Sequence, residues 1–234
     1  MVNRIQESKD FKEIIKNLDQ KDYSKALEKM KFISKDFPNE NIILKLYAVI
    51  YFNLMEWENA VDYYKKCLDF EIEKYKVHTN IGVAYFKLGK INKSIESFKK
   101  SIENNSKFAL AHINLGISYL ELSKIEKAIE HFISALELNK NDHKAQTYLI
   151  NSFNLIKPKT DQQHPLVKIN YKINELSKEI KNKDIKILLK KSNNLIKSYK
   201  ENLFFNETQI FRKNSVNLNC GRHFRVFNEF NVIP

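Results

Sequence analysis

The sequence predicts an all-α protein built as an α-solenoid, a stack of helical hairpins, and three observations lead to this prediction. A pattern of small, apolar and aromatic residues returns every 34 residues. Within each copy the apolar residues fall at helical spacing. The 234-residue chain has only 4 Gly and 4 Pro, which is low for a turn-rich β protein. Because a lone helix pair cannot bury its apolar face, repeated pairs stack and share a core.

The two clearest copies read "YFKLGKINKSIESFKKSIENN" at 85–105 and "YLELSKIEKAIEHFISALELN" at 119–139. Each is preceded by a glycine in the same frame, Gly82 before Tyr85 and Gly116 before Tyr119. The second helix of each copy continues the match with Ser94, Phe98 and Ser101 against Ala128, Phe132 and Ala135. Small residues at these points allow two helices to approach closely.

Two earlier copies are recognised by the same frame. One repeat length before Gly82, the frame returns as Leu44, Tyr47, Ala48 and Tyr51, spaced i, i+3, i+4, i+7 on one helical face, followed by Ala60, Tyr64 and Cys67. In the copy one repeat length earlier, only the second half of the pattern is present, as Ala26, Met30, Ile33 and Pro38. We therefore predict four units that begin near 7, 41, 75 and 109, and a capping helix near 143–156.

This pattern resembles the tetratricopeptide repeat family over about residues 7–156, with a leucine-like residue, Gly and Tyr, then Ala, Phe, Ala and Pro at a period of 34. The resemblance implies a right-handed solenoid with a concave groove lined by the first helices. It also implies a non-catalytic module that binds a peptide segment of another protein. The groove residues that it implies are Lys45, Val49, Phe52, Lys76, Thr79, Asn80, Val83, Phe86, Lys87, Ile113, Asn114 and Ile117.

The predicted groove has an apolar floor and lysines at its edge, which favours a partner with apolar anchors and acidic flanks. Family members that hold chaperone tails carry Asn at the ninth position, where this chain has Val49, Val83 and Ile117. That carboxylate clamp is therefore absent. Asn80 and Asn114 either form a short amide ladder for a peptide backbone or serve packing. The chain's own C-terminal helices are the alternative occupant of the groove.

Residues 1–157 are the predicted solenoid, and "KPKTDQQHP" at 157–165 reads as a linker. Apolar stripes then predict a basic helical hairpin over 158–204. Residues 205–234 form an irregular or β-like tail, which either docks on the helices or begins a further domain of a longer protein. Residues 143–234 hold 17 Lys and Arg against 7 Asp and Glu. This stretch has few of the arginines and aromatics that contact nucleic acid, so we expect no nucleic-acid binding.

The sequence lacks the motifs of common enzymes and cofactor sites. It has no Gly-rich phosphate loop, no H-E-x-x-H and no G-x-S-x-G, so we predict no catalytic residue, no metal and no cofactor. Cys220 and His223 make C-x-x-H, half of a metal site. The alternative function is the recognition arm of a larger enzyme, such as a transferase with its catalytic part beyond residue 234. The N-terminus lacks a signal sequence and no apolar run spans a membrane, so we expect a cytoplasmic protein.

Overall fold

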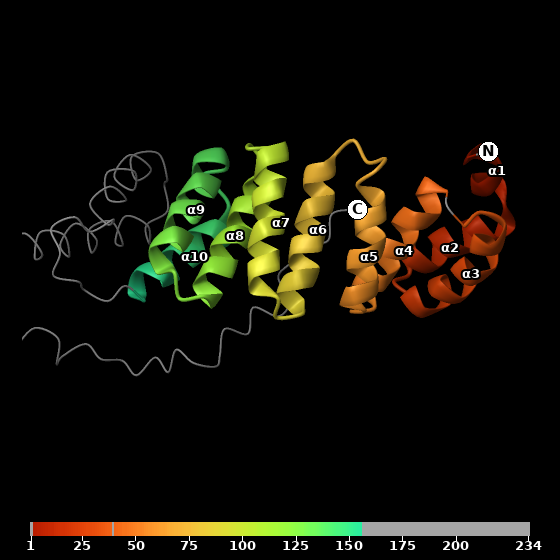
Figure 1. Cartoon of the computed structure of the whole chain (residues 1–234), viewed down its shortest axis with the longest axis horizontal. Coiled ribbons are helices and arrows are strands. Elements are labelled where there is room, and N and C mark those ends of the chain that lie inside the picture. Colours follow the sequence, from red (N-terminus) through yellow and green to blue (C-terminus); the bar gives the residue numbers. More distant parts are fainter. Residues whose placement is uncertain (1, 39, 156–234) are drawn as a thin grey trace, which may run out of the picture. The chain divides into compact units, whose positions relative to one another are not determined.

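The computed structural model describes residues 2–38 and 40–155, and every regular element in these ranges is an α-helix. The described residues form two compact units, 2–122 (unit 1) and 123–155 (unit 2). Unit 1 contains α1 (Val2–Glu7), α2 (Lys9–Asp19), α3 (Tyr23–Asp36), α4 (Asn41–Asn53), α5 (Trp57–Cys67), α6 (Lys74–Lys87), α7 (Ile91–Asn104) and α8 (Ala109–Glu121). Unit 2 contains α9 (Ile125–Leu138) and α10 (His143–Asn154) (Figure 1).

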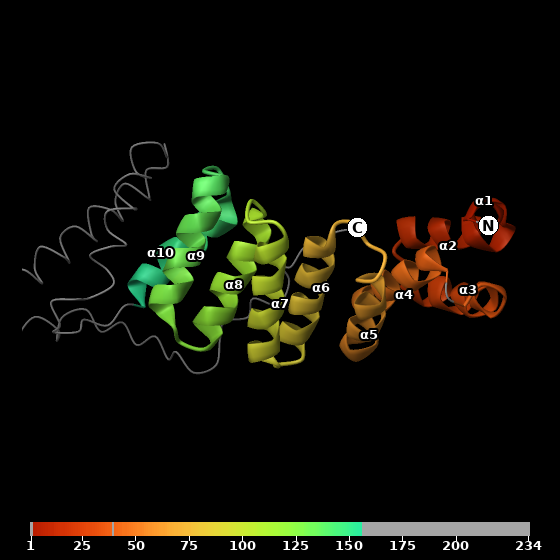
Figure 2. The same ribbon diagram turned by 45° about the horizontal axis from the view of Figure 1, so that its top comes forward.

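Unit 1 is a succession of helical hairpins in which each helix packs on the next one in the chain. The hairpins are α2–α3, α4–α5 and α6–α7, and α8 packs on α7. Figure 2 shows α6 and α7 side by side in one such hairpin. The all-helical class and the helical pairing are therefore confirmed. The predicted unit starts near 41 and 109 coincide with the first residues of α4 and α8.

The turns that follow α2, α4, α6 and α8 repeat with the same period as the sequence. Lys21, Met55, Gly89 and Ser123 all have positive φ, between 55° and 70°, and they are spaced 34 residues apart. In the first three turns the next residue's N–H bonds to the carbonyl five residues earlier, at 2.8–2.9 Å, as from Lys90 to Tyr85. This is the Schellman ending of a helix, for which Gly is the residue of least strain. The degenerate first unit thus has the same turn as the others.

We expect Met55→Gly to raise the stability of the protein. Met55 is 69% exposed, so its side chain contributes little burial, while its φ of 62° is strained for any residue with a Cβ. Removing that strain is worth roughly 0.5–1 kcal/mol, seen as a higher melting temperature by circular dichroism. Asp62→Gly, an exposed position inside α5, is the matched control. This control should lower stability by about 1 kcal/mol. Equal effects of the two changes would contradict the conclusion that the backbone is strained at Met55.

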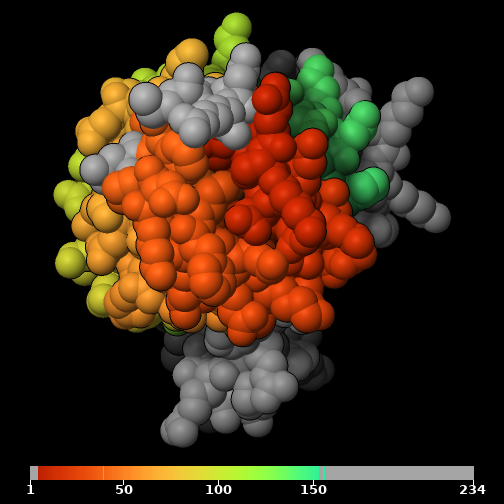
Figure 3. All heavy atoms as spheres, turned by 90° about the vertical axis from the view of Figure 1, so that its right-hand side faces the viewer, coloured from red at the N-terminus to blue at the C-terminus, as the bar shows by residue number. Residues whose placement is uncertain are grey.

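The N-terminal end of unit 1 has its own apolar core. Ile5 of α1, Ile14 of α2, Met30 of α3 and Ile43 of α4 are all fully buried within one cluster. In Figure 3 the red and orange atoms of these first helices form a continuous surface at this end. Helix α1 was not predicted, since six residues are too few to show a helical period. Burial of Ile5 ties this short helix to the first hairpin.

Unit 2 is a helical hairpin that contains the predicted capping helix. Phe132 of α9 stacks on Tyr148 of α10 with ring centroids 5.4 Å apart. Helix α10 begins at His143, where the capping helix was predicted. Among the described helices none is long and apolar enough to cross a membrane. The predicted hairpin at 158–204 and the tail at 205–234, with Cys220 and His223, lie outside the described residues.

Candidate functional site

The twelve predicted groove residues lie on α4, α6 and α8, the first helices of their repeats, and differ in accessibility. Seven of them are buried: Phe52, Thr79, Asn80, Val83, Ile113, Asn114 and Ile117. The other five are exposed or half-buried: Lys45, Val49, Lys76, Phe86 and Lys87. All five lie on α4 and α6. The accessible part of the predicted surface is therefore confined to these two helices.

Two of the buried residues have identified packing roles inside unit 1. The Thr79 hydroxyl donates to the Tyr75 carbonyl at 3.0 Å and lies 2.8 Å from the Ser101 hydroxyl. This contact joins α6 to α7. Phe52 packs edge-on against Trp57, with ring centroids 5.2 Å apart, and so joins α4 to α5. Both side chains contribute to hairpin packing.

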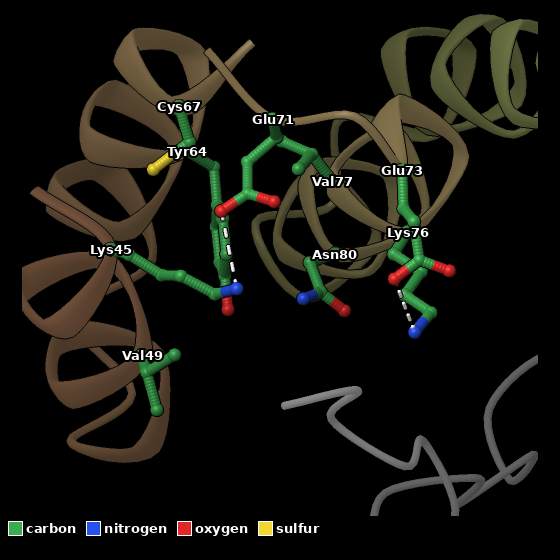
Figure 4. A pocket seen from close by; sticks show the side chains of 9 residues that line it. All are labelled: Lys45, Val49, Tyr64, Cys67, Glu71, Glu73, Lys76, Val77 and Asn80. Atoms are coloured by element: carbon green, nitrogen blue, oxygen red, sulfur yellow. Dashed lines mark ion pairs between the residues drawn. The ribbon is translucent and has the colours of Figure 1, made fainter. Parts of the chain in front are cut away.

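A small pocket opens between α4, α5 and α6 and contains three of the predicted residues besides Lys76 (Figure 4). Its cavity is about 30 Å³, room for one or two water molecules. The lining residues are Lys45, Val49, Tyr64, Cys67, Glu71, Glu73, Lys76, Val77 and Asn80. The pocket thus lies between the first helices of two adjacent repeats, and Tyr64 of α5 lines it as well.

Two ion pairs border the pocket. Lys45 Nζ lies 3.1 Å from Glu71 Oε1, and Lys76 Nζ lies 2.7 Å from Glu73 Oε2. Glu73 also accepts a 2.6 Å hydrogen bond from the Tyr75 hydroxyl. The Lys76 ammonium, followed by this hydroxyl, holds the pKa of the Glu73 carboxyl below its usual value. The two ammonium groups and the two carboxylates balance, so the residues that line the pocket carry no net charge.

The inner end of the pocket is uncharged. Burial raises the pKa of the Tyr64 hydroxyl well above its usual value, so the phenol stays protonated. The Asn80 amide opposes this rise, although the two groups do not meet the geometry of a hydrogen bond. Burial also raises the pKa of the Cys67 thiol to about 12, with Glu71 adding to the effect. A protonated thiol is a poor nucleophile and a poor metal ligand.

Sequence reasoning placed Tyr64 and Cys67 only on the packing face of α5, and it did not single out Glu71, Glu73 or Val77. One signal was present in the repeat alignment. The residues that match Tyr64 in the next two repeats are Phe98 and Phe132, so the second unit alone of these three carries a hydroxyl there. Within residues 2–38 and 40–155 no three His, Cys, Asp or Glu side chains are grouped to hold a metal.

The comparisons with known proteins agree with the repeat assignment. The family model described as tetratricopeptide repeat matches residues 75–108 and 109–142. No curated protein matches the chain. Among solved structures, MamA is 18% identical, covers 80% of this chain and 95% of its own, and has a TM-score of 0.55. A chain of the APC/C hetero-tetramer Cut9-Hcn1 is 20% identical, and its TM-score is 0.53. That match covers 59% of this chain and 28% of the other.

A third solved structure is the first tetratricopeptide repeat domain of Spaghetti (RPAP3) bound to the HSP90 peptide SRMEEVD. It is 25% identical, covers 49% of this chain and 90% of its own, and has a TM-score of 0.46. The family match covers residues 75–142, and the likeness to MamA is one of fold alone. The chain therefore carries two tandem tetratricopeptide repeats, at residues 75–108 and 109–142, within an all-helical fold of hairpins.

Proposed function

We propose that this protein is a non-catalytic interaction module that binds a peptide segment of another protein on the α4–α6 surface. The observation that carries the proposal is the pocket between the first helices of two adjacent repeats, open beside exposed and half-buried groove residues. Tandem tetratricopeptide repeats are generally protein-interaction modules, and residues 75–142 belong to this family. A stack of such repeats offers an extended surface for a linear segment.

Apolar anchors of the partner would contact the side chains of Val49 and Phe86, which are half-buried and retain accessible surface. Acidic flanks would reach the two lysines at the border of the pocket. Lys45 is 48% exposed and Lys76 is 32% exposed, and each already faces a glutamate of this chain. Exposed ion pairs contribute only about 0–1 kcal/mol. Glu73 is 51% exposed, so a partner carboxylate can replace it at little cost, whereas Glu71 is only 20% exposed.

The proposal is tested with a phage-displayed library of random dodecapeptides selected on the full chain. We expect the selected sequences to be rich in apolar residues flanked by Asp or Glu. A synthetic peptide of this type should bind Lys45→Glu about fivefold more weakly, because reversal of an exposed charge changes binding by on the order of 1 kcal/mol. Isothermal titration calorimetry at low and high salt measures the loss, which should shrink as salt screens the charges.

Lys99→Glu is the matched control, because Lys99 is an exposed lysine on α7, a second helix of its hairpin. It should leave the peptide affinity unchanged, and circular dichroism should show both variants folded. Equal losses at Lys45 and Lys99 would mean that the peptide responds only to total charge. A library that yields no preferred sequence would contradict the proposed function.

A further inference from the structure

The Tyr64 hydroxyl points into the pocket between α4, α5 and α6 (Figure 4). The Tyr64 side chain is 3% exposed, and its hydroxyl has no hydrogen-bond partner within residues 2–38 and 40–155. Buried polar groups are nearly always hydrogen-bonded, since an unsatisfied one loses its hydration without compensation. A buried hydroxyl that faces a cavity therefore indicates a group that enters the cavity.

The neighbouring repeats show that the fold does not need this hydroxyl. Phe98 and Phe132 take the matching positions in the next two repeats, and both are fully buried. The aromatic ring is thus sufficient for packing at this position. In the second repeat alone of these three, the ring carries a polar atom, and there it borders a cavity. The hydroxyl therefore has a use other than packing.

The charge and size of the pocket define the chemistry of its occupant. The ion pairs Lys45–Glu71 and Lys76–Glu73 cancel their charges, so the pocket does not select a charged group. The Tyr64 hydroxyl both donates and accepts, and the Asn80 carboxamide points into the same space (Figure 4). A cavity of about 30 Å³ admits a group of two or three heavy atoms.

We propose that this pocket is a subsite for one small, uncharged hydrogen-bonding group of the partner, of the size of a hydroxymethyl or a carboxamide. The group enters between α4 and α6 and exchanges hydrogen bonds with the Tyr64 hydroxyl. It displaces the one or two waters for which the cavity has room. This proposal rests on the proposed function, which makes the partner a peptide. It adds the class of side chain that the peptide inserts into the pocket, namely Ser, Thr, Asn or Gln.

The first experiment uses acetamide and acetate as probes, since they have the same size and differ in charge. Each is titrated into the ¹⁵N-labelled full chain while the Asn80 side-chain amide is followed by NMR. We expect a saturable shift with acetamide and none with acetate. Tyr64→Phe should weaken acetamide binding at least fivefold. Val49→Leu, which fills the pocket and leaves the hydroxyl in place, should weaken it equally.

The second experiment measures the melting temperature of the Tyr64→Phe variant without any probe. We expect it to equal or exceed that of the unaltered chain, because the hydroxyl has no hydrogen-bond partner among the described residues. A melting temperature lower by several degrees would show that the hydroxyl serves the fold and would overturn the subsite. Saturation by acetate as strong as by acetamide would also overturn it.

The third experiment separates the subsite from the proposed function. Dodecapeptides selected on the full chain that carry Ser, Thr, Asn or Gln at a constant position should lose at least fivefold in affinity on Tyr64→Phe. Peptides whose affinity survives this change would overturn the subsite and leave the proposed function standing. A library without binders would overturn the proposed function, and the acetamide titration would still decide whether the pocket takes neutral polar groups.

Discussion

Gly82→Val is expected to destabilise unit 1 by about 3 kcal/mol, near the upper end of the cost of overpacking a core. A Cβ at position 82 would lie 2.6–2.9 Å from three ring carbons of Phe98, closer than packed carbon atoms approach. The Phe98 ring is fully buried between α6 and its neighbours, so it has no free space into which to move. Glycine inside a helix destabilises it by up to about 1 kcal/mol relative to alanine, so replacing Gly82 removes that cost. The destabilisation from the clash with Phe98 is larger than this gain. Urea unfolding followed by circular dichroism measures the loss.

The control for this prediction replaces Phe98, the side chain that position 82 contacts, with a smaller side chain. Gly82→Val combined with Phe98→Leu should be more stable than Gly82→Val alone, because the shorter side chain leaves room for the new methyl groups. The two changes are in contact, so they are expected to be coupled by about 0.5–3 kcal/mol. If the losses of the single variants simply add, the Phe98 ring is not what position 82 meets.

The helices were predictable because the same residues show two periods, the helical spacing within each copy and the 34-residue spacing between copies. Ala60, Tyr64 and Cys67 were assigned to one face of a helix from their spacing, and all three are buried on α5. The turns could be placed as well, since Gly89 ends α6 with a φ of 70°. Helix α1 could not be predicted, because it shows no period and depends on the tertiary burial of Ile5.

The site was only partly predictable, because repeat position gives the face of a helix and not what covers that face. Thr79 and Phe52 were assigned to the groove, and each makes a contact that holds a hairpin together. The pocket itself combines residues from three helices and a connecting segment. Glu71 reaches Lys45 across 26 residues of chain, and nothing in the local sequence indicates that pair. The hydroxyl of Tyr64 was visible in the sequence, and its surroundings were not.

A second large effect is expected in unit 2, where Phe132→Ala should lower the free energy of unfolding by about 3–5 kcal/mol. Phe132 is fully buried, so truncation leaves a cavity as well as removing apolar contacts. It also removes the stacking on Tyr148, whose ring plane lies within 14° of its own. Because α10 packs on α9 in this unit, amides of both helices should lose protection in hydrogen exchange.

Leu138→Ala is the matched control, since Leu138 is the last residue of α9 and is 41% exposed. Truncation of an exposed side chain at a helix end should change stability by no more than about 0.5 kcal/mol. The comparison therefore isolates burial, because both changes shorten an apolar side chain on one helix. A loss at Phe132 as small as that at Leu138 would mean that α9 and α10 are held together by contacts other than this aromatic pair.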